Sequence, residues 1–269
     1  MLRKIIFISI FGIFLQINSV YAGSTDSEEL KSGSSIEETG ECFEGFSRAM
    51  FKFNHGLDKA VLKPVAKGYR AIPLPIRQGT GNFVDNLRSL LTLSNNILQG
   101  DFRAAGNTAG RFAINTTVGI LGVFDPAAAL GIEDPGKEDF GQTLGVWGAD
   151  SGCYFVLPVL GPTTARDAFG KIGNAFLDPV WHITHDSEVS NSVVGNDNYS
   201  EHNYYYYRTT DSVNFRAKNI ESFDNLEKNS IDLYASVRSL YLQNRQKKIA
   251  NAESSIETQD DSDWEELDN

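Results

Sequence analysis

Two histidines have a spacing that could hold a metal ion. His182 and His185 are three positions apart, so a helix would carry both on one face, with Asp178 and Asp186 close by. A metal hydrolase needs further ligands and a general base at fixed positions, and no zinc-protease signature accompanies the pair. We therefore predict no metal site, and a metal-dependent enzyme stays only as an alternative that bound metal would reveal.

A second short motif matches the magnesium-binding motif of protein kinases. Asp139-Phe140-Gly141 occurs without the Gly-rich loop, the catalytic-loop motif or the strand lysine that a kinase requires in order. The sequence also has no nucleophile elbow, P-loop or dinucleotide-binding fingerprint. We expect no catalytic residues, no cofactor and no enzymatic function.

The sequence contains 2 cysteines, Cys42 and Cys153. In an oxidising compartment they could form a disulfide, but the sequence does not show whether they meet in space. Two separate buried thiols are the alternative.

The N-terminal segment predicts export to such a compartment. Basic Arg3 and Lys4 precede an apolar stretch that ends near Ile17, and small residues before Gly23 predict cleavage after Ala22. The alternative is a membrane-spanning anchor, which needs about 20 apolar residues, and this stretch is shorter. No cysteine directly follows the stretch, so we expect a mature chain without N-terminal acylation.

Charge divides the chain into parts. Its 269 residues include 24 Lys and Arg against 35 Asp and Glu, a net charge of −11. The acid surplus lies in residues 23–41 and 251–269, which are poor in apolar side chains and predict a disordered linker and tail. Residues 42–250 hold equal numbers of acids and bases and predict the folded domain. The acidic total argues against a nucleic-acid partner.

The first predicted helix, from Phe43 to Leu62, carries a stripe of large apolar residues. Their helical spacing predicts either a core-facing helix or one that faces lipid, with basic residues at head-group level. The candidates for a membrane-facing stripe are Phe43, Phe46, Met50, Phe53 and Leu57.

Further helices follow this one. Pro64, Pro73 and Pro75 predict breaks before a second amphipathic helix over residues 82–99. Residues 101–124 form a Gly-rich helical segment in which Gly106 and Gly110 have the spacing of close helix packing in lipid. Close packing in a soluble core is the alternative.

Two uncharged runs, 112–124 and 151–165, are too short to span a bilayer, so the sequence argues against a conventional polytopic membrane protein. They are candidates for segments that enter a bilayer partway or pack deeply. The run Tyr204–Tyr207 predicts an interfacial aromatic belt or a stack on neighbouring helices. Residues 213–245 predict one or two closing helices.

The residues resemble the MlaA (VacJ) family in order over about 43–245. The most specific block is Asp139–Gly148, and the closing helix matches at Asp232, Tyr234, Arg238, Tyr241, Gln243 and Arg245. The other matching blocks are Glu44–Met50, Lys63–Ala66, Asn82-Phe83, Leu98–Gly100, Arg111-Phe112, Leu157-Pro158, Leu160–Pro162 and Arg166-Asp167.

The resemblance implies a mainly α fold, a ring-like bundle of amphipathic helices with Gly/Pro-rich connections that lies in one membrane leaflet. It also implies an outer-membrane component of Gram-negative bacteria that removes misplaced outer-leaflet phospholipid through an amphipathic channel. The implied partners are phospholipid, the outer membrane, a trimeric porin and the periplasmic lipid carrier MlaC. A porin-associated scaffold or a soluble periplasmic lipid binder is the alternative.

Three polar residues in or after the best-matching block are candidates for the lipid path: Gln142, Thr143 and Arg166. Capping and bracing of the Gly-Pro turns is their alternative role. Two departures from the family pattern stand out. Many members are lipoproteins, and the family usually has Asp-Pro near position 42 and no cysteine near 153. Both cysteines are thus departures, which favours their pairing.

Overall fold

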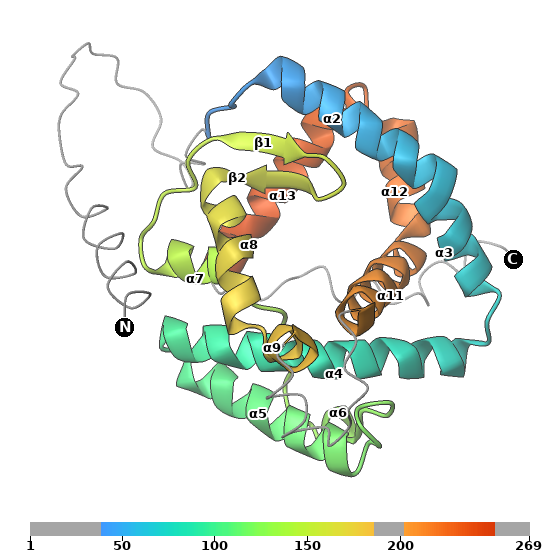
Figure 1. Ribbon diagram of the computed structural model, residues 1–269, viewed down its shortest axis with the longest axis vertical. Coiled ribbons are helices and arrows are strands. Elements are labelled where there is room, and N and C mark those ends of the chain that lie inside the picture. The colour runs from blue at the N-terminus through green and yellow to red at the C-terminus, as the bar shows by residue number, and fades with distance from the viewer. Residues whose placement is uncertain (1–38, 186–201, 251–269) are drawn as a thin grey trace, which may run out of the picture. The chain divides into compact units, whose positions relative to one another are not determined.

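The computed structural model describes residues 39–185 and 202–250 (Figure 1). The predicted signal peptide with its Ala22–Gly23 cleavage site, most of the acidic linker and the acidic tail lie outside the described residues. Glu41 forms a parallel bridge with Tyr154 of the first strand, so contacts with the folded part occur ahead of the predicted domain start at Cys42.

The described residues are mainly helical, as predicted, with one small sheet that the sequence reading missed. In chain order the elements are α2 (Glu44–Leu57), the π-helical segment η1 (Asp58–Leu62), α3 (Lys63–Arg70), α4 (Leu74–Gln99), α5 (Phe102–Thr117), α6 (Pro126–Ala129), α7 (Phe140–Val146), β1 (Tyr154–Leu157), β2 (Gly161–Thr164), α8 (Ala165–Leu177), α9 (Pro179–His185), α11 (His202–Lys218), α12 (Ile220–Asn229) and α13 (Leu233–Ile249). Within the described ranges, no helix has both the length and the hydropathy needed to cross a bilayer.

The first helix is longer than predicted. α2 continues through η1 into α3, and Pro64 lies in the first turn of α3 instead of ending the helix. The turn before Pro64 is wound as a π-helix, in which the N–H of Lys63 donates to the carbonyl of Asp58, so the proline lies at a change of winding and not in a regular α-helical interior.

α4 also begins earlier than predicted, at Leu74, with Pro75 in its first turn. Gly79 and Gly81 lie inside this helix because neighbours come close to them. A Cβ at Gly79 would be 3.0 Å from a methyl carbon of Val123, and one at Gly81 would be 2.8 Å from the amide nitrogen of Asn214. These glycines therefore permit close packing within the helix.

α5 packs against α4, but not through the predicted glycines. Its buried residues are Ala105, Thr108 and Asn115, which face α4 and the loop after α5. A Cβ built on Gly106 or Gly110 would meet no atom of the described chain within 4 Å. The close-packing role predicted for these two glycines is thus corrected: they lie off the face of α5 that packs.

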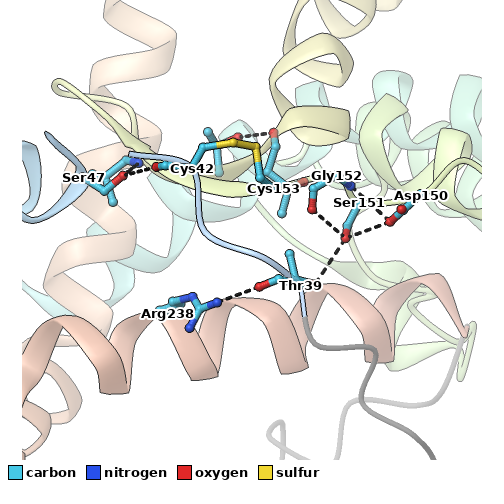
Figure 2. The surroundings of a disulfide bond; sticks show 11 residues. Thr39, Cys42, Ser47, Asp150, Ser151, Gly152, Cys153 and Arg238 are labelled. Atoms are coloured by element: carbon cyan, nitrogen blue, oxygen red, sulfur yellow. Dashed lines mark hydrogen bonds between the residues drawn. A yellow bond between two sulfur atoms is a disulfide. The ribbon is translucent and has the colours of Figure 1, made fainter. Parts of the chain in front are cut away.

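A disulfide joins Cys42 to Cys153 and fixes the start of the folded part to the small sheet (Figure 2). The two Cα atoms are 5.4 Å apart. The N–H of Cys42 donates to the carbonyl of Tyr154 at 2.9 Å, and the N–H of Tyr154 donates to Gly40 at 2.8 Å. Arg238 of α13 donates to the carbonyl of Thr39 at 2.6 Å, so the strand-like start also contacts the closing helix.

The sheet is an antiparallel hairpin in which Tyr154 pairs with Thr164 and Leu157 with Gly161. Its buried side chains, Tyr154 and Val156, form a core cluster with Tyr234 of α13. In Figure 1 the helices of residues 39–250 follow one another around a circuit, with the hairpin and α13 beside the first helix. Buried apolar clusters are small and separate, and many large apolar side chains are exposed.

Candidate functional site

Among the described residues, a cavity of about 580 Å³ is lined by several of these helices and by the hairpin. Its walls come from the first helix (α2, η1 and the start of α3), the hairpin turn, α11, α12 and α13. Arg88 of α4 and Lys137, from the segment before α7, complete the wall. Elements from nearly the whole described chain therefore contribute to one site.

Much of the cavity wall is apolar. Several large apolar side chains line the cavity and remain accessible to solvent, including Leu160 on the hairpin turn, Phe215 on α11 and Phe223 on α12. Large apolar groups that face a cavity and not a packed core favour an apolar ligand.

Ion pairs line the same cavity and join the first helix to α11 and α12. Lys63 contacts Asp224 at 2.7 Å, and Lys59 contacts Glu227. The guanidinium of Arg216, only 4% exposed, donates twice to Asp58, at 2.8 and 2.9 Å. These pairs hold the two sides of the cavity together without filling it, so the wall is amphipathic.

Beside the cavity, a buried ionic network joins α7, α8 and α13. Arg245 donates to both oxygens of Asp139, at 2.6 and 3.0 Å, and to Asp167 at 2.7 Å. Tyr241, one helical turn earlier, donates to the other oxygen of Asp167 at 2.5 Å. Asp139 also caps α7 by accepting from the N–H of Gln142 at 3.0 Å.

Glycines allow this network to form. A Cβ on Gly141 would be 2.7 Å from the Asp167 carboxylate, and a Cβ on Gly170 would be 2.4 Å from the backbone nitrogen of Gly141. The kinase-like triplet Asp139-Phe140-Gly141 is therefore a structural unit in which Asp139 caps a helix and Gly141 admits α8.

Two neighbouring carboxyl groups have pKa values shifted in opposite directions. Burial raises the pKa of Glu138 to about 7, although Gln99 and the charges of Lys248 and Arg245 oppose the rise and Asp139 adds to it. For Asp139 burial also favours a higher pKa, but the hydrogen bonds and charge of Arg245 outweigh it and hold the pKa well below its ordinary value. Asp139 is thus a fixed anion beside a carboxyl group that can lose its charge.

The sequence of this fold matches a known family along almost the whole described range. The model of the family described as "MlaA lipoprotein" matches residues 40–248. The chain belongs to the MlaA family.

Individual relatives agree with the MlaA assignment. The chain is 32% identical over 222 residues to a Haemophilus influenzae protein named "Intermembrane phospholipid transport system lipoprotein MlaA", covering 80% of this chain and 81% of that one. It is 32% identical over 224 residues to the Escherichia coli protein of the same name, covering 82% of each. An uncharacterized Rickettsia bellii protein is 35% identical over 210 residues, covering 77% of this chain and 76% of that one.

A solved structure has the same fold. It was reported as "Structural basis for maintenance of bacterial outer membrane lipid asymmetry", with a TM-score of 0.62 and 31% sequence identity. The match covers 78% of this chain and 99% of the solved one. The mainly helical MlaA fold is therefore confirmed, while the hairpin adds a small sheet to the prediction.

None of the three predicted lipid-path residues of the MlaA block lines the cavity. Gln142 and Thr143 are buried in α7, where Gln142 donates to Asp139 at 3.1 Å and Thr143 donates to Asn95 at 2.8 Å. Arg166 donates to Asp167 at 3.3 Å and to the carbonyl of Ala149 at 3.3 Å. All three brace the elements around the cavity.

The predicted membrane-facing stripe is mostly exposed. Phe43 is 81% exposed, Phe46 51%, Phe53 53% and Leu57 37%. Met50 differs, because it packs against the cluster of Tyr154, Val156 and Tyr234, so it faces the protein interior.

Other predicted features also have a place in the structure. His182 donates from Nε2 to the carbonyl of Phe176 at 2.8 Å, and the side chain of His185 lies outside the described residues. In the tyrosine run, Tyr204 and Tyr207 pack inward against Val84 and Val180, whereas Tyr205 and Tyr206 are exposed. Two tyrosines of the run thus stack on neighbouring helices, as one of the two predicted roles requires, and the other two face outward.

Sequence reasoning missed the cavity's cations, Arg88, Lys137 and Lys248. No short motif marks them, because they come from three distant segments. Arg245 was noticed as part of the closing helix of the MlaA pattern, but not as the centre of the ionic network. The sequence feature that could have indicated this role is the presence of Arg245 in the closing-helix block together with Asp139 in the Asp139–Gly148 block, since the two have opposite charges.

The raised pKa of Glu138 predicts a pH-dependent stability. A carboxyl group whose folded pKa is raised stabilises the fold below its ordinary pKa of 4.5, and this contribution disappears as the pH rises to about 7. The Glu138→Gln side chain is neutral at every pH. The free energy of unfolding of this variant, taken relative to that of wild type, should therefore rise by about 3 kcal/mol between pH 4.5 and about 7. Urea unfolding at several pH values measures the difference. Glu133→Gln, at an exposed carboxylate, is the matched control, and parallel pH profiles for Glu138→Gln and wild type would contradict the prediction.

Proposed function

We propose that this chain is an outer-membrane component that removes mislocalised phospholipid from the outer leaflet and passes it to a periplasmic lipid carrier. The observation that carries the proposal is the amphipathic cavity, with exposed apolar side chains and charged groups on one continuous wall. A phospholipid has this combination of acyl chains and a charged head group. The names of the relatives, which refer to intermembrane phospholipid transport, support the same assignment.

Such a protein needs to bind a phospholipid and let it pass, and it does not need to make or break covalent bonds. Returning a misplaced lipid toward its equilibrium leaflet is energetically downhill, so a polar path for the head group can suffice. Among the residues that the structure describes, the side chains of the network around Arg245 form hydrogen bonds with one another. We assign Gln142, Thr143 and Arg166 the role of bracing this path from outside the cavity wall.

We also propose that the ring of helices lies in the periplasmic leaflet of the outer membrane. The exposed Phe43, Phe46 and Phe53 on and before α2 support this, since burying each in lipid would stabilise attachment by about 2 kcal/mol. Without a cysteine after the apolar leader, attachment rests on these helices and not on an acyl chain. A trimeric porin and the carrier MlaC are the partners that this placement favours.

Narrowing the cavity should abolish lipid removal. Ser212 on α11 lines the cavity and is exposed, so Ser212→Trp should fill the path while leaving the core intact. Ser222→Trp on α12 adds the same bulk outside the cavity wall and is the control. The measurement is outer-leaflet phospholipid on intact cells of a Gram-negative host lacking its own family member, read with an impermeant amine-reactive label.

We expect Ser212→Trp cells to label like cells without the chain, and Ser222→Trp cells to label like wild type. A porin-associated scaffold would tolerate both changes equally. Normal clearance by Ser212→Trp would therefore reject the cavity as the lipid path.

The membrane placement has its own test. Wild type should be extracted from outer-membrane fractions only by detergent. The triple variant Phe43→Ser, Phe46→Ser, Phe53→Ser should be partly released by alkaline carbonate, because it lacks three apolar anchors. Mass spectrometry of the mature wild type should find no acyl group. Release of wild type without detergent would favour a soluble carrier, and an acylated N-terminus would refute attachment by helices.

A further inference from the structure

One side of the cavity gathers cations from three separate segments. Arg88 of α4, Lys137 before α7 and Lys248 near the end of α13 all line it. Arg88 and Lys137 also line a smaller polar cavity of about 120 Å³ next to α5. Three cations from distant parts of the chain thus meet at a junction between two cavities.

Two of these cations have carboxylate partners. Arg88 donates to Asp211 at 2.9 Å, and Lys137 donates to Asp85 at 2.6 Å. Lys248 differs: within residues 39–185 and 202–250 no carboxylate oxygen lies within 4.0 Å of its ammonium group. Its hydrogen bond there is a long one, 3.5 Å, to the backbone carbonyl of Lys137.

The acids near Lys248 are committed elsewhere. Asp139 is held by both terminal nitrogens of Arg245. Glu138 accepts from Gln99 at 2.9 Å, and its raised pKa lets it lose its charge near neutral pH. Burial lowers the pKa of Lys248, partly opposed by these two acids, which is the physical cost of an ammonium without a close counter-ion. The site therefore has a cation in excess.

The apolar wall lies away from this point. Leu233 and Val237 line the cavity from the first turns of α13, while Lys248 is near its last residue. At 1.5 Å per residue, Leu233 and Lys248 are about 20 Å apart along the helix. An elongated amphipathic molecule could place an anion at Lys248 and apolar chains near the start of α13.

We propose that Lys248, assisted by Arg88 and Lys137, binds the phosphate group of the phospholipid that occupies the cavity. This inference rests on the proposed function and names the head-group site within it. A lipid head group and free phosphate both present a phosphate anion, which an unpaired ammonium and two neighbouring cations bind by charge-assisted hydrogen bonds. A partly buried ammonium without an ion-pair partner destabilises a fold, so its presence at a cavity wall is explained by a ligand that completes it.

Binding of short-chain probes to the full chain in detergent tests the site. The probes are dihexanoylphosphatidylglycerol, dihexanoylglycerol without a phosphate, and inorganic phosphate, with affinities measured by calorimetry. Lys248→Gln should weaken binding of the phosphate-bearing lipid by about tenfold or more and leave dihexanoylglycerol binding unchanged. Lys248→Arg should restore most of the affinity, because it restores the charge. Lys228→Gln on the exposed side of α12 is the control and should bind all probes like wild type.

Melting curves separate binding from folding, and Lys248→Gln should melt no lower than wild type. Wild-type affinity of Lys248→Gln for both lipids would overturn the phosphate site while leaving the proposed function intact. Binding of inorganic phosphate as tight as that of the lipid would overturn the head-group assignment in favour of free phosphate. Wild-type protein that binds neither lipid would overturn both the site and the proposed function.

Discussion

The buried contact of Arg245 with Asp139 and Asp167 is the interaction on which the rest of the structure depends. It joins the last helix to α7 and α8, so residues more than a hundred positions apart in the chain close the circuit of helices. Removing one partner of such a buried cluster costs about 3–5 kcal/mol, because a charge is left without compensation. Gly141 and Gly170 are glycines for the same reason: a side chain at either would occupy the space in which α7, α8 and Arg245 meet.

This constraint explains why the cavity exists. With the circuit closed by ionic contacts, the first helix is held against α11 and α12 by ion pairs such as Arg216 with Asp58 and by only a small apolar cluster of Ala66, Ala217 and Ile220. Apolar side chains such as Phe215 and Phe223 are then left facing the interior space. The small, separate core clusters and the exposed apolar residues of α2 follow from the same arrangement, in which much of the apolar surface faces the cavity or the exterior.

Sequence reasoning predicted the helical class and the family, because both depend on local periodicity and on ordered blocks such as Asp139–Gly148. It misjudged Pro64, Gly106 and Gly110, whose effects depend on which neighbours come close in space. It missed the hairpin at residues 154–164, since a short uncharged run does not distinguish a strand from a buried helix. The cations of the cavity could not be predicted, because only the closed circuit brings Arg88, Lys137 and Lys248 together.

The central claim is that phospholipid occupies the cavity, and photocrosslinking from inside it is the most direct measurement. A photoreactive amino acid at Leu226, which lines the cavity from α12, should form adducts that contain lipid phosphorus. The same amino acid at Lys228, exposed on the same helix and outside the cavity wall, should form few. Absence of lipid adducts at Leu226, or equal adducts at both positions, would contradict the account.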